Sequence, residues 1–332
     1  MSRPRAILAA GALAVATPAA AHHGVAAVGV AGPEGPGAAL ETTSSLPLPQ
    51  DVLFTLARTE YVPFERFGFA EPNNKTYSSF NMVALGYGLR PWLSVYVFQP
   101  YNVKAQDGIG TNAAAGDTSV MASLAFKWDE GLRLVPEKES LDELTDWHFS
   151  AWASCTVPVA STTARDDLGA YLAPDMQTGF GGPSPVVGVS ALKQLTSDLT
   201  WLADASAQYF FPHTYPFTRY QFGAEARVDT ASVYRVYGAG RFRFDLSGEL
   251  NGLLLRRDRE RSDAGAMEPL PASGGTILYA GAGARVFYGP FSVAVGVRRA
   301  AWKDLNEQAA QQGSEGLERF RAALTVGYST RL

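Results

Sequence analysis

The chain has 332 residues, of which 46 % are hydrophobic and 18 % are charged. Its net charge of −4 provides no basic excess of the kind that binds nucleic acid non-specifically. Beyond the extreme N-terminus the sequence contains no apolar run of about 18 residues, which excludes a transmembrane helix there. A charge-poor, aromatic-rich chain must then bury its apolar surface against lipid in a β-barrel or inside a soluble β-sandwich.

The first 21 residues have the order of a secretory signal peptide. Arg3 and Arg5 form a positive start, residues 6–16 (AILAAGALAVA) are apolar, and residues 19–21 are small enough for a cleavage site. The segment is too short for a transmembrane helix, although a retained N-terminal anchor is the alternative. We predict cleavage after residue 21, so that the mature chain begins at His22.

Residues 22–50 are rich in Gly, Pro and Ala and show no periodicity. Such a composition predicts an irregular segment before the first strand. The segment is either a plug inside a barrel lumen or a flexible linker, and the sequence favours neither.

From residue 51 to the end, apolar and polar side chains alternate with the period of two that is typical of β-strands. The apolar faces, for example residues 278–288, are rich in Ala and Gly and end in aromatic residues. This composition indicates an apolar belt between two aromatic girdles, whereas a soluble sandwich would fill its core with bulky aliphatic side chains. We therefore predict an all-β protein, an antiparallel transmembrane β-barrel over residues 51–332.

The alternation predicts about 12 strands, separated by connectors of two kinds. Short turns at 90–91, 196–198, 246–248 and 289–290 alternate with long loops, and the acidic connector 129–146 is the exception. Bacterial outer-membrane barrels have short periplasmic turns and long outer loops, which places both termini in the periplasm. Residues 220–228 also alternate and are interpreted as an extension of the following strand; as a separate strand they would change the count. The predicted strands are 52–61, 77–90, 92–103, 117–128, 147–157, 184–195, 199–211, 232–245, 249–257, 276–288, 290–301 and 318–331.

Short motifs in the barrel region resemble a known family. They are GDTSVMASLAFKW at 116–128, GFGGPSP at 179–185, GELNGLLLRRDRE at 248–260 and GGTILYAGAGARV at 274–286. Together they resemble the outer-membrane transporter family of the meta-pathway of phenol degradation. The resemblance implies a barrel that takes up small, often aromatic compounds. The expected partners are outer-membrane lipid, a small-molecule solute and, during biogenesis, the barrel-assembly machinery; no cofactor and no nucleic acid are expected.

The polar faces of the predicted strands carry charges of both signs, which would point into the lumen. In a confined lumen such charges pair with one another or remain hydrated. They therefore form either a salt-bridge network that closes a structural barrel, or a ladder that guides an anionic or aromatic solute. The candidate lumen residues are Arg227, Arg235, Arg241, Arg243, Arg285, Arg319, Arg321, Asp204, Glu225, Asp245 and Glu249.

The sequence offers little for catalysis. His148 and Ser150 share one strand face, but no acid stands in a third position, and there is no P-loop, GxSxG or HExxH motif. We expect a lumenal His148, an inert outward-facing Cys155 and no enzymatic activity. After signal cleavage, His22 and His23 are candidate copper or zinc ligands, with the alternative that they bind nothing.

Overall fold

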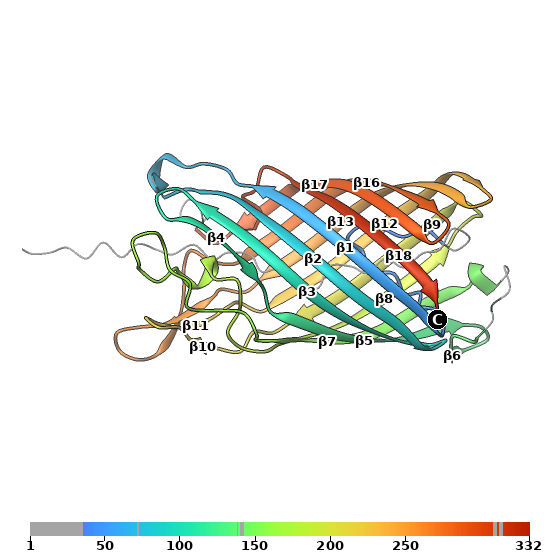
Figure 1. The fold of residues 1–332 in the computed structure, drawn as a ribbon, viewed down its shortest axis with the longest axis horizontal. Coiled ribbons are helices and arrows are strands. Elements are labelled where there is room, and N and C mark those ends of the chain that lie inside the picture. Colours follow the sequence, from blue (N-terminus) through green and yellow to red (C-terminus); the bar gives the residue numbers. More distant parts are fainter. Residues whose placement is uncertain (1–35, 72, 138, 140–142, 308–310, 312–314) are drawn as a thin grey trace, which may run out of the picture.

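A computed structural model of the chain shows a closed antiparallel β-barrel, drawn in Figure 1. It describes residues 36–332 except 72, 138, 140–142, 308–310 and 312–314. The predicted signal peptide, His22 and His23 lie outside the described residues.

The main sheet has 14 strands, and without the short edge strands β4 (Gly110–Ala115) and β6 (Leu132–Leu134) the barrel itself has 12. It closes because β3 pairs with β5 and β1 pairs with β18. The predicted fold is therefore confirmed. The barrel strands are β1 (Val52–Pro63), β2 (Lys75–Arg90), β3 (Leu93–Gln106), β5 (Thr118–Trp128), β7 (Trp147–Val157), β8 (Ser184–Gln194), β9 (Leu199–Gln208), β12 (Glu225–Ala239), β13 (Phe242–Leu255), β16 (Gly275–Tyr288), β17 (Phe291–Leu305) and β18 (Arg321–Arg331).

One predicted turn is wrong. Residues 246–248 lie inside β13, and the hairpin turns instead at Gly240 and Arg241, where Ala239 pairs with Phe242. Gly240 has a φ of +55°, and a glycine at the first position of a two-residue turn fits the twist of a hairpin. The strand predicted over 232–245 accordingly ends earlier, and β12 begins at Glu225.

The connectors separate into two ends of the barrel, which we call the turn end and the loop end. The turn end carries the short turns and both strand ends nearest the termini, whereas the long connectors lie at the loop end (Figure 1). The exception, 129–146, lies at the turn end and contains the 3-10 helix η2 (Glu143–Thr145). At the loop end, η1 (Gly68–Ala70) and η3 (Pro174–Met176) interrupt two connectors.

A second sheet lies at the loop end, beyond the ends of the barrel strands. We call it the loop-end sheet; its strands pair in the order β10 (His213–Thr214), β11 (Arg219–Gln221), β14 (Arg259–Arg261) and β15 (Met267–Pro269). The aromatic residues Phe210, Tyr215, Tyr220 and Phe222 form a buried cluster beneath it.

The outward side chains of the barrel form an exposed apolar belt. Val83, Val189 and Val228, from three parts of the wall, are 57 % to 60 % exposed. A contiguous apolar surface of this kind is stable only against an apolar environment. The inward side chains are mostly polar or charged and buried. Among the described residues, no helix is long and apolar enough to cross a bilayer.

Candidate functional site

Residues 36–50 lie inside the barrel; we call them the lumen segment. Ala39 and Leu48 are buried. Backbone N–H groups at the two ends of the segment donate hydrogen bonds to different strands of the wall. The Gly37 N–H donates to Thr200 Oγ1 of β9 (2.9 Å), and the Leu48 N–H donates to Ser94 Oγ of β3 (2.8 Å). The segment therefore crosses the interior and occupies it. The hydrogen bonds at Gly37 and Leu48 attach this segment to two separate parts of the wall.

Glu249 of β13 is the principal anchor of the lumen segment. Its Oε1 accepts a hydrogen bond from the Leu40 N–H (2.6 Å), and its Oε2 accepts bonds from the N–H groups of Glu41 and Thr42 (both 3.0 Å). Successive backbone N–H groups that converge on one carboxylate form an anion-binding nest. Here the lumen segment supplies the N–H groups, and the barrel wall supplies the carboxylate.

Further wall residues hold the same turn of chain. Arg58 Nη1 donates to the Leu40 carbonyl and Arg285 Nη2 donates to the Ala39 carbonyl, both at 3.0 Å. Asp204 accepts a hydrogen bond from the Thr43 N–H (2.5 Å). Charged side chains thus satisfy backbone polar groups of residues 39–43, which compensates for the removal of these groups from water.

Leu40 also fits the wall by shape. Gly283 and Gly296 pair across β16 and β17, and a Cβ added to either would lie 1.9 Å or 2.2 Å from Leu40 Cδ1. The two glycines therefore form a notch that receives the leucine side chain.

A charge cluster joins the segment to the wall around Glu60 of β1. Glu60 pairs with Arg58 (3.1 Å), Arg298 (3.5 Å) and Arg321 (3.4 Å). Glu41 of the lumen segment pairs with Arg58 and with Arg298, the latter at 3.3 Å. Buried charges of this kind are tolerated only when they are paired, so loss of one member leaves its partners uncompensated.

The structure places nine of the predicted lumen residues on inward, buried or half-buried positions, but distributes them among separate groups. Asp204, Glu249 and Arg285 bind the lumen segment, and Arg321 belongs to the charge cluster. The others form local pairs or stand beside them: Arg227 with Glu225 at 2.8 Å, Arg243 with Asp245 at 2.6 Å, and half-buried Arg235 nearby on β12.

Arg241 and Arg319 are wrong as lumen residues. Arg241 is exposed because it forms the two-residue turn between β12 and β13. Arg319 is exposed because it precedes β18, where its N–H donates to the Pro63 carbonyl and the chain still belongs to a connector. At both positions the sequence still alternates between polar and apolar residues, but the strands do not extend that far.

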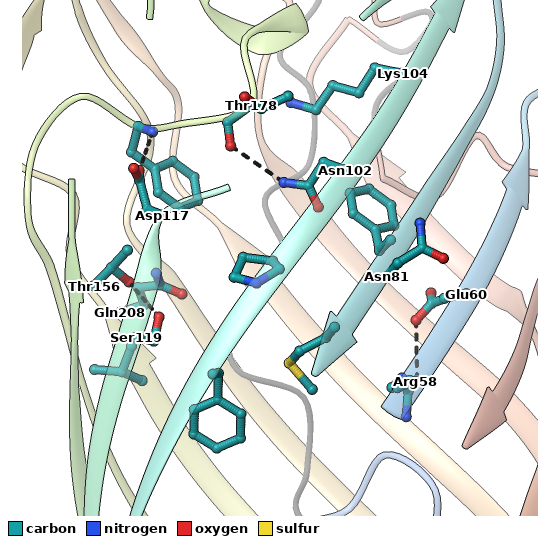
Figure 2. A pocket seen from close by; sticks show the side chains of 16 residues that line it. Arg58, Glu60, Asn81, Asn102, Lys104, Asp117, Ser119, Thr156, Thr178 and Gln208 are labelled. Carbon is teal, nitrogen blue, oxygen red and sulfur yellow. Dashed lines mark hydrogen bonds and ion pairs between the residues drawn. The ribbon is translucent and has the colours of Figure 1, made fainter. Parts of the chain in front are cut away.

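A cavity of about 90 Å³ lies inside the barrel between the charge cluster and the loop end (Figure 2). Arg58 and Glu60 line it on one side, and Thr178 and Phe180 of the connector 158–183 line it on another. Its apolar lining consists of Phe80, Met82, Phe98, Pro100, Phe180 and Val186. Asn102, Ser119 and Gln208 supply hydrogen-bonding groups.

The connector 158–183 folds into the barrel mouth over this cavity. Lys104 Nζ donates to the carbonyls of Asp175 (2.7 Å) and Gln177 (2.6 Å), and Lys75 forms an ion pair with Asp175. Asn102 Nδ2 donates to the Thr178 carbonyl at 3.3 Å, as Figure 2 shows. The cavity is therefore bounded toward the loop end by chain that two lysines hold in place.

A buried acid, Asp258, contacts the aromatic cluster beneath the loop-end sheet. Tyr220 donates its hydroxyl hydrogen to Asp258 (2.5 Å), which also accepts from the Gly223 N–H (2.6 Å). Burial raises the pKa of Asp258 to about 7, because removal from water disfavours the charged carboxylate.

The histidine singled out in the sequence lies at the turn end. His148 is fully buried; its Nε2 lies 3.0 Å from Glu139 Oε1 and its Nδ1 lies 3.1 Å from the Asp146 carbonyl. Ser150 bonds instead to Ser190 (2.7 Å), so the described contacts join no histidine to this serine. Cys155 is exposed on the outward face. Within the described part of the chain, no three His, Cys, Asp or Glu residues gather as metal ligands.

Sequence reasoning missed the members of the charge cluster on β1 and β17. Arg58 and Glu60 alternate with Ala57, Thr59 and Tyr61, which is the same signal that identified the charges on later strands. Lys104 and Asp175 could not have been paired from the sequence, since a strand and a distant loop supply them.

Comparisons show the fold alone. No family model and no curated protein matches the sequence. The structure is similar to the COG4313 outer membrane channel from Pseudomonas putida F1, with a TM-score of 0.64 and 11 % identity, over 86 % of this chain and 98 % of that chain. The beta domain of the Bordetella autotransporter BrkA matches over 84 % of this chain and 99 % of its own at a TM-score of 0.44 and 11 % identity, too low to support an argument.

Proposed function

We propose that this protein is an outer-membrane channel for small, apolar or aromatic solutes, with both termini in the periplasm. The observation that carries the proposal is the closed barrel whose outer wall is an apolar belt and whose interior holds a cavity lined by apolar side chains together with polar and charged ones. A barrel without edges can satisfy its backbone in lipid. The division into a turn end and a loop end supports the orientation, because outer-membrane barrels keep their short turns in the periplasm.

The lining of the cavity supports the solute class. Four of its side chains, Phe80, Met82, Phe98 and Phe180, present rings or a thioether, and amides and hydroxyls lie beside them. This combination suits a ring that bears a polar group. An engineered cavity of about 150 Å³ binds benzene. At about 90 Å³ this cavity admits nothing larger than a single ring unless the lumen segment or the connector 158–183 moves. The motif resemblance to the phenol meta-pathway family points to the same class.

Transport then requires displacement of the lumen segment, which blocks the route toward the turn end. The segment is attached by hydrogen bonds and ion pairs, and Ala39 and Leu48 also pack in apolar clusters with wall side chains. Its displacement therefore has to break both kinds of contact. A channel of this design conducts in discrete openings and has a low resting permeability.

Proteoliposomes test the proposal directly. Uptake of phenol should exceed that of a sugar of similar mass, and it should rise when residues 36–47 are deleted. Correct assembly of the deletion variant is checked by its migration on an unheated gel. If neither the protein nor the deletion variant carries current or solute, the channel is excluded and a closed, salt-bridged structural barrel is favoured.

A further inference from the structure

The loop-end sheet carries an unusual concentration of exposed arginines. Arg219 of β11 and Arg259 and Arg261 of β14 are exposed, as are Arg256 and Arg257 just before β14. This local excess stands out in a chain whose net charge is −4.

The strand register places like charges together. Tyr220 pairs with Glu260 and Gln221 with Arg259, so one step further along the same register Arg219 stands opposite Arg261. Like charges directly opposite each other destabilise a strand pair. Within the described part of the chain no carboxylate forms an ion pair with these arginines; Arg259 donates one hydrogen bond, to the Met267 carbonyl (2.8 Å). An anion between these exposed guanidinium groups would relieve their repulsion.

The acids of the same strands lie on the opposite face. Glu260 pairs with Glu268 across β14 and β15, on the side that carries Tyr220. Asp258 is buried beneath the sheet against Tyr220. Because side chains alternate across a strand, the sheet separates its charges into an acidic face and an arginine face, which consists of Arg219, Arg259 and Arg261.

The arginine face continues the outward wall of the barrel. Gln221 lies on the same face as Arg219, and its Nε2 donates to the hydroxyl oxygen of Tyr209 at 3.0 Å. Tyr209 and its ring neighbour Phe211 are 47 % and 48 % exposed, at the loop end of the outward row that follows β9. Aromatic residues at the edge of an apolar belt mark the headgroup level of a bilayer. The arginines therefore stand just above that level and face outward rather than over the pore.

We propose that the arginine face binds the phosphate groups of lipopolysaccharide in the outer leaflet around the barrel. Guanidinium groups bind phosphate through paired, charge-assisted hydrogen bonds, and a phosphate between Arg219 and Arg261 would relieve their repulsion. The inference rests on the proposed orientation, which puts the loop end outside the cell. The ligand forms a lipid annulus and is not the transported solute.

Lipid binding is measured on the purified full-length protein in nonionic detergent, titrated with bisphosphorylated lipid A. The variant Arg219→Gln/Arg259→Gln/Arg261→Gln should bind with a Kd at least ~10-fold weaker, because each arginine near an anionic lipid surface contributes several-fold to binding. Its binding should also depend less on salt. The matched control Arg90→Gln/Arg241→Gln/Arg331→Gln removes three exposed arginines at the turn end and should bind like the unaltered chain. Equal Tm values without lipid establish that both variants are folded.

Equal lipid A affinity in the two triple variants would overturn the proposal. It is also overturned if inorganic phosphate raises the Tm as much as lipid A does, which would indicate a site for free anions. A third contrary result is slower uptake of an anionic solute with unchanged lipid affinity, which would assign the arginines to solute attraction.

The orientation is tested separately, with Ala266→Cys in a Cys155→Ser background and a membrane-impermeant maleimide on intact cells. Labelling supports a loop end outside the cell. Absence of labelling refutes the orientation whatever the lipid result, whereas labelling with unchanged lipid affinity refutes the lipid site alone.

Discussion

Glu249 and Leu40 are joined by a hydrogen bond of 2.6 Å although 209 positions separate them in the chain. The same carboxylate binds the next two backbone N–H groups, so a single side chain of the wall holds a complete turn of the lumen segment. We expect this contact to contribute strongly to holding the lumen segment in place.

The first prediction concerns Glu249→Gln. An amide keeps the shape of the side chain but presents one donor group to backbone N–H groups that need acceptors, and a hydrogen bond to a charged group contributes about 1.5–3 kcal/mol. We expect the open probability in planar bilayers to rise at least ~10-fold, since about 1.4 kcal/mol corresponds to that factor. Glu268→Gln, at an exposed carboxylate of the loop-end sheet, is the control and should leave the current unchanged. Identical current traces for both variants would show that Glu249 does not hold the closed state.

The second prediction concerns the hub of the charge cluster. Glu60→Gln leaves Arg58, Arg298 and Arg321 with less compensating charge in a buried site, and breaking a buried pair costs about 3–5 kcal/mol. The free energy of unfolding in urea should fall by that order. Asp129→Asn removes an exposed partner of Arg133 and should change it by less than about 1 kcal/mol. A similar loss in both variants would contradict a special role for the cluster.

The third prediction uses the notch that receives Leu40. Gly283→Ala introduces a Cβ where Leu40 Cδ1 now lies, and overpacking of this kind costs about 1–3 kcal/mol. The lumen segment should become more accessible to protease, and Leu40→Ala in the same chain should restore its protection relative to Gly283→Ala alone. Gly248→Ala is the matched control, because an added Cβ there meets no atom within 4 Å. If Leu40→Ala does not restore protection from protease, the effect of Gly283→Ala does not act through contact with the lumen segment.

The fourth prediction is a pH dependence of the loop end. The pKa of Asp258 is about 7 in the folded protein against 3.8 for the free side chain, because burial disfavours its charge. Between these values the folded state binds more protons than the unfolded state, so its stability falls as pH rises through that window. Each unit of pKa difference is worth about 1.4 kcal/mol. Amides of β11 and β14 should therefore exchange hydrogen more slowly at pH 5 than at pH 8, after correction for the intrinsic exchange rate.

Asp258→Asn provides the control for that measurement. The amide keeps an acceptor for the Gly223 N–H but does not titrate, so the pH dependence of local stability should flatten. An unchanged dependence would assign the effect to another group.

Much of the barrel follows from the sequence because a strand in a wall has one apolar and one polar face. The period of two identified the strand number, the inward phase of Asp204 and Glu249, and the two kinds of connector. It could not locate the β12–β13 hairpin, because the alternation of Asp245 and Glu249 continues through the Ser247–Gly248 pair that looked like a turn. The actual signal was the single glycine at position 240.

The contents of the lumen were decided by tertiary structure alone. Residues 36–50 have no periodic pattern, and their position depends on wall side chains 161 to 209 residues away, such as Asp204 and Glu249. Local alternation specifies which way a side chain points, but not what it meets there. The sequence by itself therefore determined a barrel with a charged interior, whereas closure of the barrel brought those charges together in pairs and clusters and placed the lumen segment among them.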